Sequence, residues 1–258
     1  MASGAFTVDV EGATLAGERR GAEAPPLVLL HGMAGERGDW DRLIQALPAD
    51  YPILRYDLRG FGLSDSDDRE YSHSDDLLAL FDTLGIDRAT VLGLSMGGGV
   101  ALNFALSHPD RVSRLILISP AIVGWEWSAE WRGLWRDVSR AARDGDLALA
   151  HERWFQHPMF AVVRESEAAD DLRHAIDSYH GRQWIRDPQR MELPDVDRLH
   201  TLAMPTLLLT GEHDVADMRL IADVIAGAAP QVRRIDFAGA GHMLHIERPQ
   251  EVATAILG

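Results

Sequence analysis

Three side chains of this 258-residue sequence could together carry out nucleophilic catalysis: Ser95, Asp214 and His242. Ser95 is the centre of residues 93–97, Gly-Leu-Ser-Met-Gly. A serine on a sharp strand-to-helix turn needs such glycines two residues to either side, because larger side chains would collide with the turn. Its hydroxyl would then project above the sheet edge. The motif by itself leaves an ordinary glycine–serine turn open, so partners must be found elsewhere.

Asp214 and His242 have the chemistry that a serine nucleophile requires. The base takes the hydroxyl proton, and the anion fixes the imidazole tautomer and stabilises the cation that forms. Asp214 follows a predicted strand at 206–210, and His242 follows one at 233–237 after a glycine-rich turn. Alternatives for the acid and the base stand close by, namely Glu212, Asp217 and His245.

Two backbone N–H groups are candidates for stabilising an oxyanion. Residues 27–30 form a continuous apolar run that ends at His31-Gly32, a tight turn that can present the N–H of Met33. The N–H of Met96 would point from the start of the helix after Ser95 toward the group that the serine attacks. An ordinary loop after the strand could have the same sequence. The His31-Gly32 dipeptide alone therefore does not distinguish such a loop from a turn that donates to an oxyanion.

Short apolar runs alternate with helical patterns along most of the chain, after a leading hairpin at 6–10 and 13–17. This alternation predicts an α/β fold with a doubly wound, mostly parallel sheet whose active site lies beyond the carboxyl ends of the strands. The expected strands are 27–30, 53–56, 89–94, 112–119, 206–210 and 233–237, and the expected helices 40–47, 75–84, 217–228 and 251–257.

The stretch 121–200 differs from the rest, because helical periodicity dominates it and no buried-strand run occurs. Six of the seven tryptophans lie there, and residues 131, 134, 135 and 138 mark one apolar helix face. We expect a helical lid over a core formed by 1–120 and 201–258. Most of the rings would pack within this lid while one or two line an apolar pocket; the candidate pocket residues are His31, Gly32, Trp125, Trp127, Trp154 and Met243.

Composition excludes several classes of protein. A net charge of −15 disfavours nucleic acid and anionic membranes as partners. The apolar runs are too short to span a membrane, and no secretory signal is recognised, so a cytoplasmic location is expected. Cysteine is absent, and Phe155 stands where a zinc-protease helix starting at His151 needs its second histidine. No metal or cofactor is therefore expected, and a homodimer stays open.

The chain resembles the α/β-hydrolase fold family, in particular small bacterial carboxylesterases and enol-lactone hydrolases. The order Ser95, Asp214, His242 is the order that this family uses. The resemblance also includes the His31-Gly32 turn, the loop 57–64, the segment 211–214 and the Glu-Arg-Pro at 247–249. It implies that Asp214 is the acid after the penultimate strand and that Ser95 forms an acyl-enzyme.

The predicted activity is hydrolysis of a carboxylic ester or a lactone with an apolar portion. The serine nucleophile disfavours the dehalogenases and epoxide hydrolases of the family, which carry aspartate there. Carbon–carbon bond hydrolases of the family often carry tryptophan after the catalytic histidine, where this chain has Met243. That reaction, a hydrolase-fold small-molecule receptor, and acyl transfer to an acceptor other than water remain alternatives.

Overall fold

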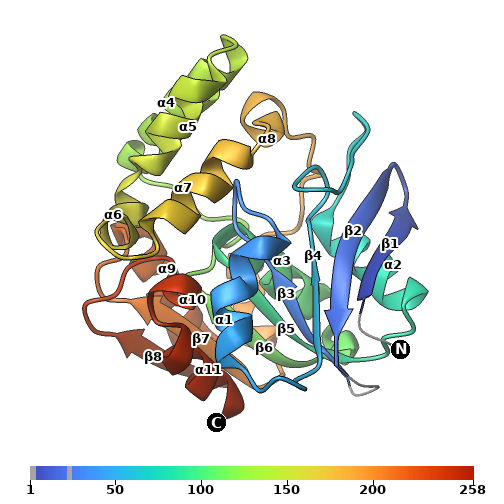
Figure 1. Cartoon of the computed structure of the whole chain (residues 1–258). Coiled ribbons are helices and arrows are strands. Elements are labelled where there is room, and N and C mark those ends of the chain that lie inside the picture. The colour runs from blue at the N-terminus through green and yellow to red at the C-terminus, as the bar shows by residue number, and fades with distance from the viewer. Residues whose placement is uncertain (1–3, 22–24) are drawn as a thin grey trace.

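An eight-stranded sheet forms the centre of the structure, a computed structural model that describes residues 4–21 and 25–258 (Figure 1). The strand order is β1-β2-β4-β3-β5-β6-β7-β8; β2 runs antiparallel to both of its neighbours, β1 and β4, and every other pairing is parallel. The strands are β1 (Gly4–Val10), β2 (Ala13–Arg20), β3 (Leu27–Leu30), β4 (Ile53–Tyr56), β5 (Ala89–Leu94), β6 (Val112–Ile118), β7 (Thr206–Gly211) and β8 (Val232–Phe237). This arrangement confirms the predicted hairpin and the predicted parallel sheet.

The central strands are mostly buried because helices cover both faces of the sheet. All residues of β3 and β7 are buried, which explains why β3 is continuously apolar and why β7 has an apolar run at its centre. The helices α1 (Asp41–Ala46) and α11 (Pro249–Leu257) pack together on the face toward the viewer in Figure 1. On the other face α2 (His73–Thr83) packs against α3 (Ser95–Ser107), and α9 (Ala216–Ala228) contacts β7 and β8.

The segment between β6 and β7 contains helices and none of the strands of the sheet. It lies beyond the ends of the parallel strands, at the top of Figure 1. Its elements are α4 (Ala129–Arg143), α5 (Leu147–Phe155), η3 (Pro158–Phe160), α6 (Ala161–Arg164), α7 (Ala169–Ser178), α8 (Arg182–Ile185), η4 (Asp195–Asp197) and η5 (Leu199–Thr201). Short elements elsewhere are η1 (Arg37–Trp40), η2 (Pro109–Arg111) and α10 (Leu244–Glu247). The helix expected at 40–47 is thus divided between η1 and α1, and α10 was not expected.

Side-chain contacts hold this helical segment to the rest of the structure. The Ser128 hydroxyl caps the start of α4 and also donates to Asp217 on α9, at 2.6 Å. Arg42 on α1 donates to Asp171 on α7 over 2.6 Å. Because these contacts connect several points of the segment to both faces of the sheet, its position over the strand ends is well defined.

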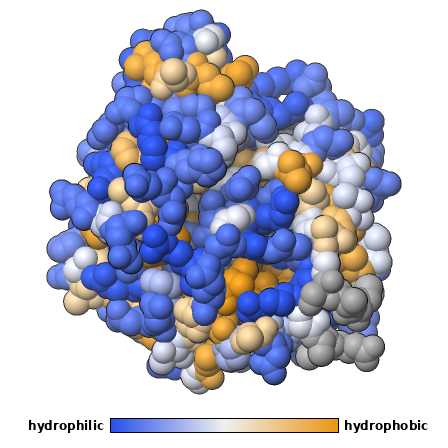
Figure 2. All heavy atoms as spheres, in the orientation of Figure 1, coloured by the Kyte–Doolittle hydropathy of each residue, from blue (hydrophilic) through white to orange (hydrophobic). Residues whose placement is uncertain are grey.

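The face seen in Figure 2 is mostly hydrophilic, with separate apolar patches, one of them at the top where α4 and α5 lie in Figure 1. Such a surface agrees with the net charge of −15. Within residues 4–21 and 25–258, no helix is long and apolar enough to cross a membrane.

Candidate active site

Ser95 lies where β5 ends and α3 begins, and its backbone has a φ of 52°. Non-glycine residues rarely adopt this left-handed conformation, so it marks a turn that the surrounding structure enforces. A Cβ at Gly93 would lie 2.2 Å from the carbonyl oxygen of Gly97, and a Cβ at Gly97 would lie 2.3 Å from that of His31. Both glycines are therefore required by close backbone approach, as the sequence motif predicts.

Asp214 and His242 form a buried pair beside this turn. Asp214 follows β7 and His242 follows β8, and Oδ2 of the carboxylate lies 2.9 Å from Nδ1 of the imidazole. Each side chain is 1% exposed. The other carboxylate oxygen accepts the N–H of Val215 at 2.7 Å. A carboxylate at Nδ1 favours the tautomer with the proton on that nitrogen, which leaves Nε2 as the basic atom.

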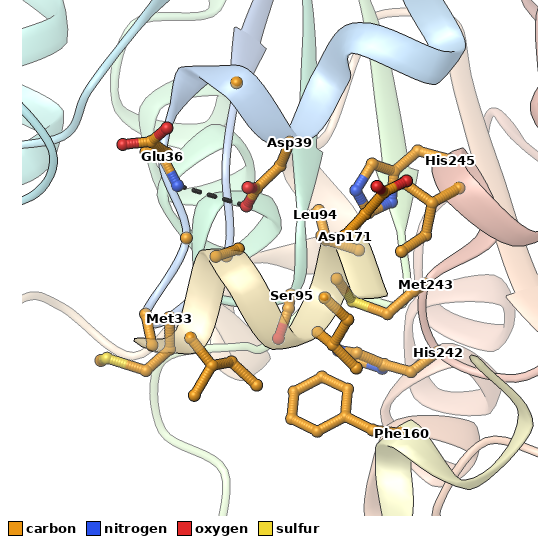
Figure 3. A pocket seen from close by; sticks show the side chains of 18 of the residues that line it. Met33, Glu36, Asp39, Leu94, Ser95, Phe160, Asp171, His242, Met243 and His245 are labelled. Atoms are coloured by element: carbon orange, nitrogen blue, oxygen red, sulfur yellow. Dashed lines mark hydrogen bonds between the residues drawn. The ribbon is translucent and has the colours of Figure 1, made fainter. Parts of the chain in front are cut away.

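His242 and Ser95 line the same cavity (Figure 3). Nε2 is buried and has no hydrogen-bond partner within the described parts of the chain. A direct bond to Ser95 is thus not formed in this state. In serine hydrolases without substrate this contact is often long and tightens when a substrate binds. The arrangement brings together all three residues that the sequence singled out.

Glu247 holds the turn that carries His242, a role that sequence reasoning missed. Its Oε2 accepts the N–H of Gly241 at 2.6 Å, and its Oε1 accepts the N–H of Met243 at 3.0 Å. The carboxylate therefore bonds to the residues on both sides of His242. The only signal in the sequence was the Glu-Arg-Pro at 247–249, which says nothing about these contacts.

The two expected oxyanion donors lie next to Ser95. Met33 follows β3, and the next residue, Ala34, has a φ of 59°, so this turn too is strained. Met96 is in the first turn of α3, where backbone N–H groups have no partner inside the helix. Both residues line cavities that contain Ser95.

Two cavities meet at Ser95, and four of the six predicted pocket residues line them. The first cavity has a volume of about 590 Å³ and includes Gly32, Trp154 and Met243. The second cavity has a volume of about 440 Å³ and includes Trp127 and again Trp154.

The other two predicted pocket residues, His31 and Trp125, line neither cavity and are corrections to the expectation. Nε2 of His31 accepts the N–H of Leu58 at 3.0 Å, so this ring connects the loop after β3 to the loop after β4. Trp125 donates its indole N–H to Asp217 at 3.2 Å. Both side chains are occupied by structural hydrogen bonds.

The alternatives for acid and base have other partners. Asp217 accepts from Ser128 and Trp125, and Glu212 accepts the N–H of Gly239 at 2.9 Å. His245 is fully buried against Trp40, with ring centroids 4.8 Å apart. None of the three is positioned to pair with the catalytic candidates.

Burial changes the charge of several groups around the first cavity. Burial, together with the nearby His242, lowers the pKa of His245 to about 3. Burial likewise lowers the pKa of His157 to about 4, again with a contribution from His242. In contrast, burial raises the pKa of Asp39 to about 7. Burial therefore keeps the imidazoles of His157 and His245 uncharged at neutral pH.

The parts of the chain that the structure describes contain no cluster of three or more histidine, aspartate or glutamate side chains that could hold a metal ion. The groups gathered around Ser95 are the imidazole of His242, the carboxylate of Asp214 and the backbone N–H groups of Met33 and Met96. Together they have the composition that acyl transfer through a serine requires.

Residues 25–249 match the profile of the alpha/beta hydrolase fold family, and the chain therefore belongs to that family. A Bacillus subtilis protein provisionally named 2-succinyl-6-hydroxy-2,4-cyclohexadiene-1-carboxylate synthase is 30% identical over 241 residues, which cover 87% of this chain and 86% of that protein. Carboxylesterase YbfK of Bacillus subtilis is 26% identical over 249 residues, covering 91% of this chain and 80% of that protein. Among solved structures, the enol-lactonase from Burkholderia xenovorans has a TM-score of 0.84 at 25% identity and covers 98% of each chain. These similarities confirm the resemblance inferred from the motifs.

Proposed function

We propose that this α/β-hydrolase cleaves carboxylic esters or lactones through an acyl-enzyme on Ser95. The observation that carries the proposal is the buried Asp214–His242 pair, whose histidine lines the same cavity as Ser95 and whose Nε2 has no hydrogen-bond partner in the described parts of the chain. The similarity to a carboxylesterase and to an enol-lactonase supports the same reaction class. No cofactor takes part in this chemistry.

The mechanism follows from the positions of these atoms. Nε2 of His242 takes the proton of the Ser95 hydroxyl while Oγ bonds to the ester carbonyl carbon. The N–H groups of Met33 and Met96 stabilise the oxyanion; losing one such donor typically costs about 2.7–4 kcal/mol of barrier. His242 returns the proton to the alkoxide as the carbon–oxygen bond breaks. Water then cleaves the acyl-serine by the same proton transfers, which releases the acid and restores Ser95.

The helical segment 121–200 acts in this proposal as a lid over the core formed by 1–120 and 201–258. Trp154, Met159 and Phe160 of this segment reach the cavities around Ser95. Apolar side chains over a polar reaction centre exclude bulk water and strengthen its electrostatic interactions. A cytoplasmic location and a homodimer stay predictions of the sequence alone.

A second candidate is the reaction named for the Bacillus subtilis synthase, because that relative is 30% identical. The name of that protein specifies a carboxylate product. The first cavity here is bordered by the carboxyl groups of Glu36, Asp39, Asp41 and Asp171, with Arg42 among them bound to Asp171. Arg42 balances only one of these carboxyl groups, so the border keeps a net negative charge even with Asp39 partly protonated near pH 7. A negative border disfavours an anionic substrate, so ester hydrolysis is the better supported of the two.

The decisive experiment compares wild type and Ser95→Ala on p-nitrophenyl esters from acetate to octanoate and on a simple lactone. We expect many turnovers by wild type and a loss of at least about 10³-fold in the variant. A fluorophosphonate should label wild type at Ser95, with fluoride as the leaving group, and should not label the variant. A single burst without turnover would instead support the receptor alternative. Equal rates in both proteins would reject Ser95 as the nucleophile.

A further inference from the structure

The two cavities that meet at Ser95 differ in which of the proposed catalytic groups line them. Both are lined by Ser95 and Met33, and Trp154 and Met159 also belong to both. His242 lines the first cavity only, whereas Met96 lines the second only. Two cavities therefore diverge from Ser95, an arrangement that we call the fork, and the base His242 lines only the first of them.

The position of the base determines which half of an ester enters which cavity. The alkoxide must receive its proton from Nε2 of His242 as it leaves, so the alcohol portion has to lie on the histidine side. The oxyanion points to the backbone donors, and one direction remains for the acyl group. That direction is the second cavity. The water that later cleaves the acyl-serine must also meet His242, and it therefore arrives through the first cavity.

The walls of the two cavities agree with this assignment. Carboxyl groups and an arginine lie at the border of the first cavity, as suits an alcohol and incoming water. Trp127, Trp131 and Trp135 line the second cavity together with Val100 and Ile122. Its charged lining residues, Arg132, Arg190 and Glu192, include both signs.

The tryptophans of the second cavity contact one another and Trp154 through their rings. The rings of Trp127 and Trp131 are stacked, with centroids 4.3 Å apart and planes 18° apart. Trp135 meets Trp154 edge to face at 5.8 Å. Such flat, closely packed rings suit a planar or hydrocarbon group better than a polar one.

We infer that the preferred substrate is an open-chain ester with an aromatic or bulky apolar acyl group in the second cavity and an alcohol without negative charge in the first. This inference rests on the proposed ester hydrolysis and selects esters over lactones within it. A lactone ties the acyl and alcohol portions into one ring, so they cannot diverge into both cavities. It therefore forfeits contacts that an open ester makes on both sides of the carbonyl.

Two constitutional isomers test the orientation directly. Methyl phenylacetate carries its ring on the acyl side, and benzyl acetate carries the same ring on the alcohol side. With each rate divided by that of hydroxide hydrolysis, we expect kcat/KM to be at least tenfold higher for methyl phenylacetate. We expect 3-isochromanone, the lactone that joins both portions, to be at least tenfold poorer than methyl phenylacetate. Equal or reversed preferences would overturn the inference.

Variants of the two cavities should have separate effects. Trp131→Ala opens the second cavity and should lower kcat/KM for methyl phenylacetate at least tenfold relative to methyl acetate. Ala175→Phe narrows the first cavity and should lower kcat/KM for benzyl acetate at least tenfold relative to methyl acetate. Tyr51→Ala, which removes a half-buried ring that lines neither cavity, should change neither ratio.

The outcomes separate this inference from the proposed function. The inferred substrate orientation would be wrong if Trp131→Ala lowered kcat/KM for benzyl acetate relative to methyl acetate, or if both variants lowered both ratios equally. The proposed ester hydrolysis would still stand, because Ser95 would still turn over esters. If wild type neither hydrolysed these esters nor reacted with the fluorophosphonate, the proposed function itself would fail. Thermal unfolding of each variant checks that it folds, and Trp127→Ala replaces Trp131→Ala if needed.

The charge of the alcohol is tested with 4-carboxybenzyl acetate. The carboxyl groups bordering the first cavity should make its kcat/KM at least tenfold lower than that of benzyl acetate, and added salt should reduce the difference. An equal or higher kcat/KM for the anionic ester would contradict the inferred exclusion of negative charge.

Discussion

Nδ1 of His242 lies 2.9 Å from Oδ2 of Asp214, although 28 positions separate the two residues in the sequence. Both side chains are buried, and the pair lies at the carboxyl ends of adjacent strands, β7 and β8. A buried carboxylate at this nitrogen orients the ring and stabilises the imidazolium that forms when serine is deprotonated.

Asp214→Asn should lower kcat by about 10³- to 10⁴-fold with little change in KM, because the amide can hold the imidazole in the wrong tautomer. Steady-state kinetics on an ester that wild type cleaves would measure this. Glu212→Gln is a matched control, since its carboxylate is exposed and bonds to Gly239 instead. If both variants lost activity equally, Asp214 would have no special role.

Glu247→Gln should lower kcat/KM by about 10- to 100-fold, because an amide oxygen accepts one N–H while the amide nitrogen accepts none. One of the two bonds that flank His242 would be lost, and the imidazole would be less well positioned. Glu251→Gln removes an exposed carboxylate from the following helix and should retain activity. Unchanged kinetics in Glu247→Gln would show that this turn needs no such support.

Gly97→Ala should destabilise the fold by about 3 kcal/mol or more, because the new Cβ would meet the carbonyl oxygens of Leu30 and His31 at 2.3 Å. In the middle of α4, Gly133→Ala should raise stability by about 1 kcal/mol, since the nearest atom is 3.9 Å away and alanine favours helix. Denaturant unfolding of both variants tests the contrast. A stable Gly97→Ala protein would mean that the turn can open.

His73→Leu should reduce the sensitivity of the fold to acid. Burial lowers the pKa of His73 from 6.5 to about 3, so below pH 6.5 the unfolded chain binds a proton that the folded chain does not. The free energy of unfolding then falls by up to about 1.4 kcal/mol per pH unit between pH 6.5 and 3. Neither ring nitrogen has a hydrogen-bond partner among residues 4–21 and 25–258, so leucine sacrifices no such bond.

The measurement is urea unfolding of wild type and His73→Leu at several pH values from 7 to 4. The difference in stability between them should grow in favour of the variant as the pH falls. The exposed His200, replaced in the same way, should leave the pH dependence as in wild type. Parallel curves for His73→Leu and wild type would exclude this histidine as a cause of acid sensitivity.

The predicted strands agree with the structure because their signal is local. A strand covered by helices on both faces favours apolar residues on both of its sides; β3 is apolar throughout, and β5, β6 and β7 each contain an apolar run interrupted by a few polar residues or glycine. The turn at Ser95 is equally local, since collisions within a few residues and with the neighbouring strand demand glycine. Short α10 was missed because four residues are too few to show a helical period.

The residue types needed for acyl transfer, their order along the chain and the sheet that carries them could be inferred from the sequence. Which side chains reach the cavities could not. His31 and Trp125 were expected there, yet both side chains form hydrogen bonds elsewhere. Glu247 supports the turn that carries His242, and no sequence motif predicted this role. The fork at Ser95 likewise depends on how α4 to α7 pack over the strand ends. Sequence spacing determines local backbone geometry, whereas the direction and partner of a side chain depend on packing between elements that are far apart in the chain.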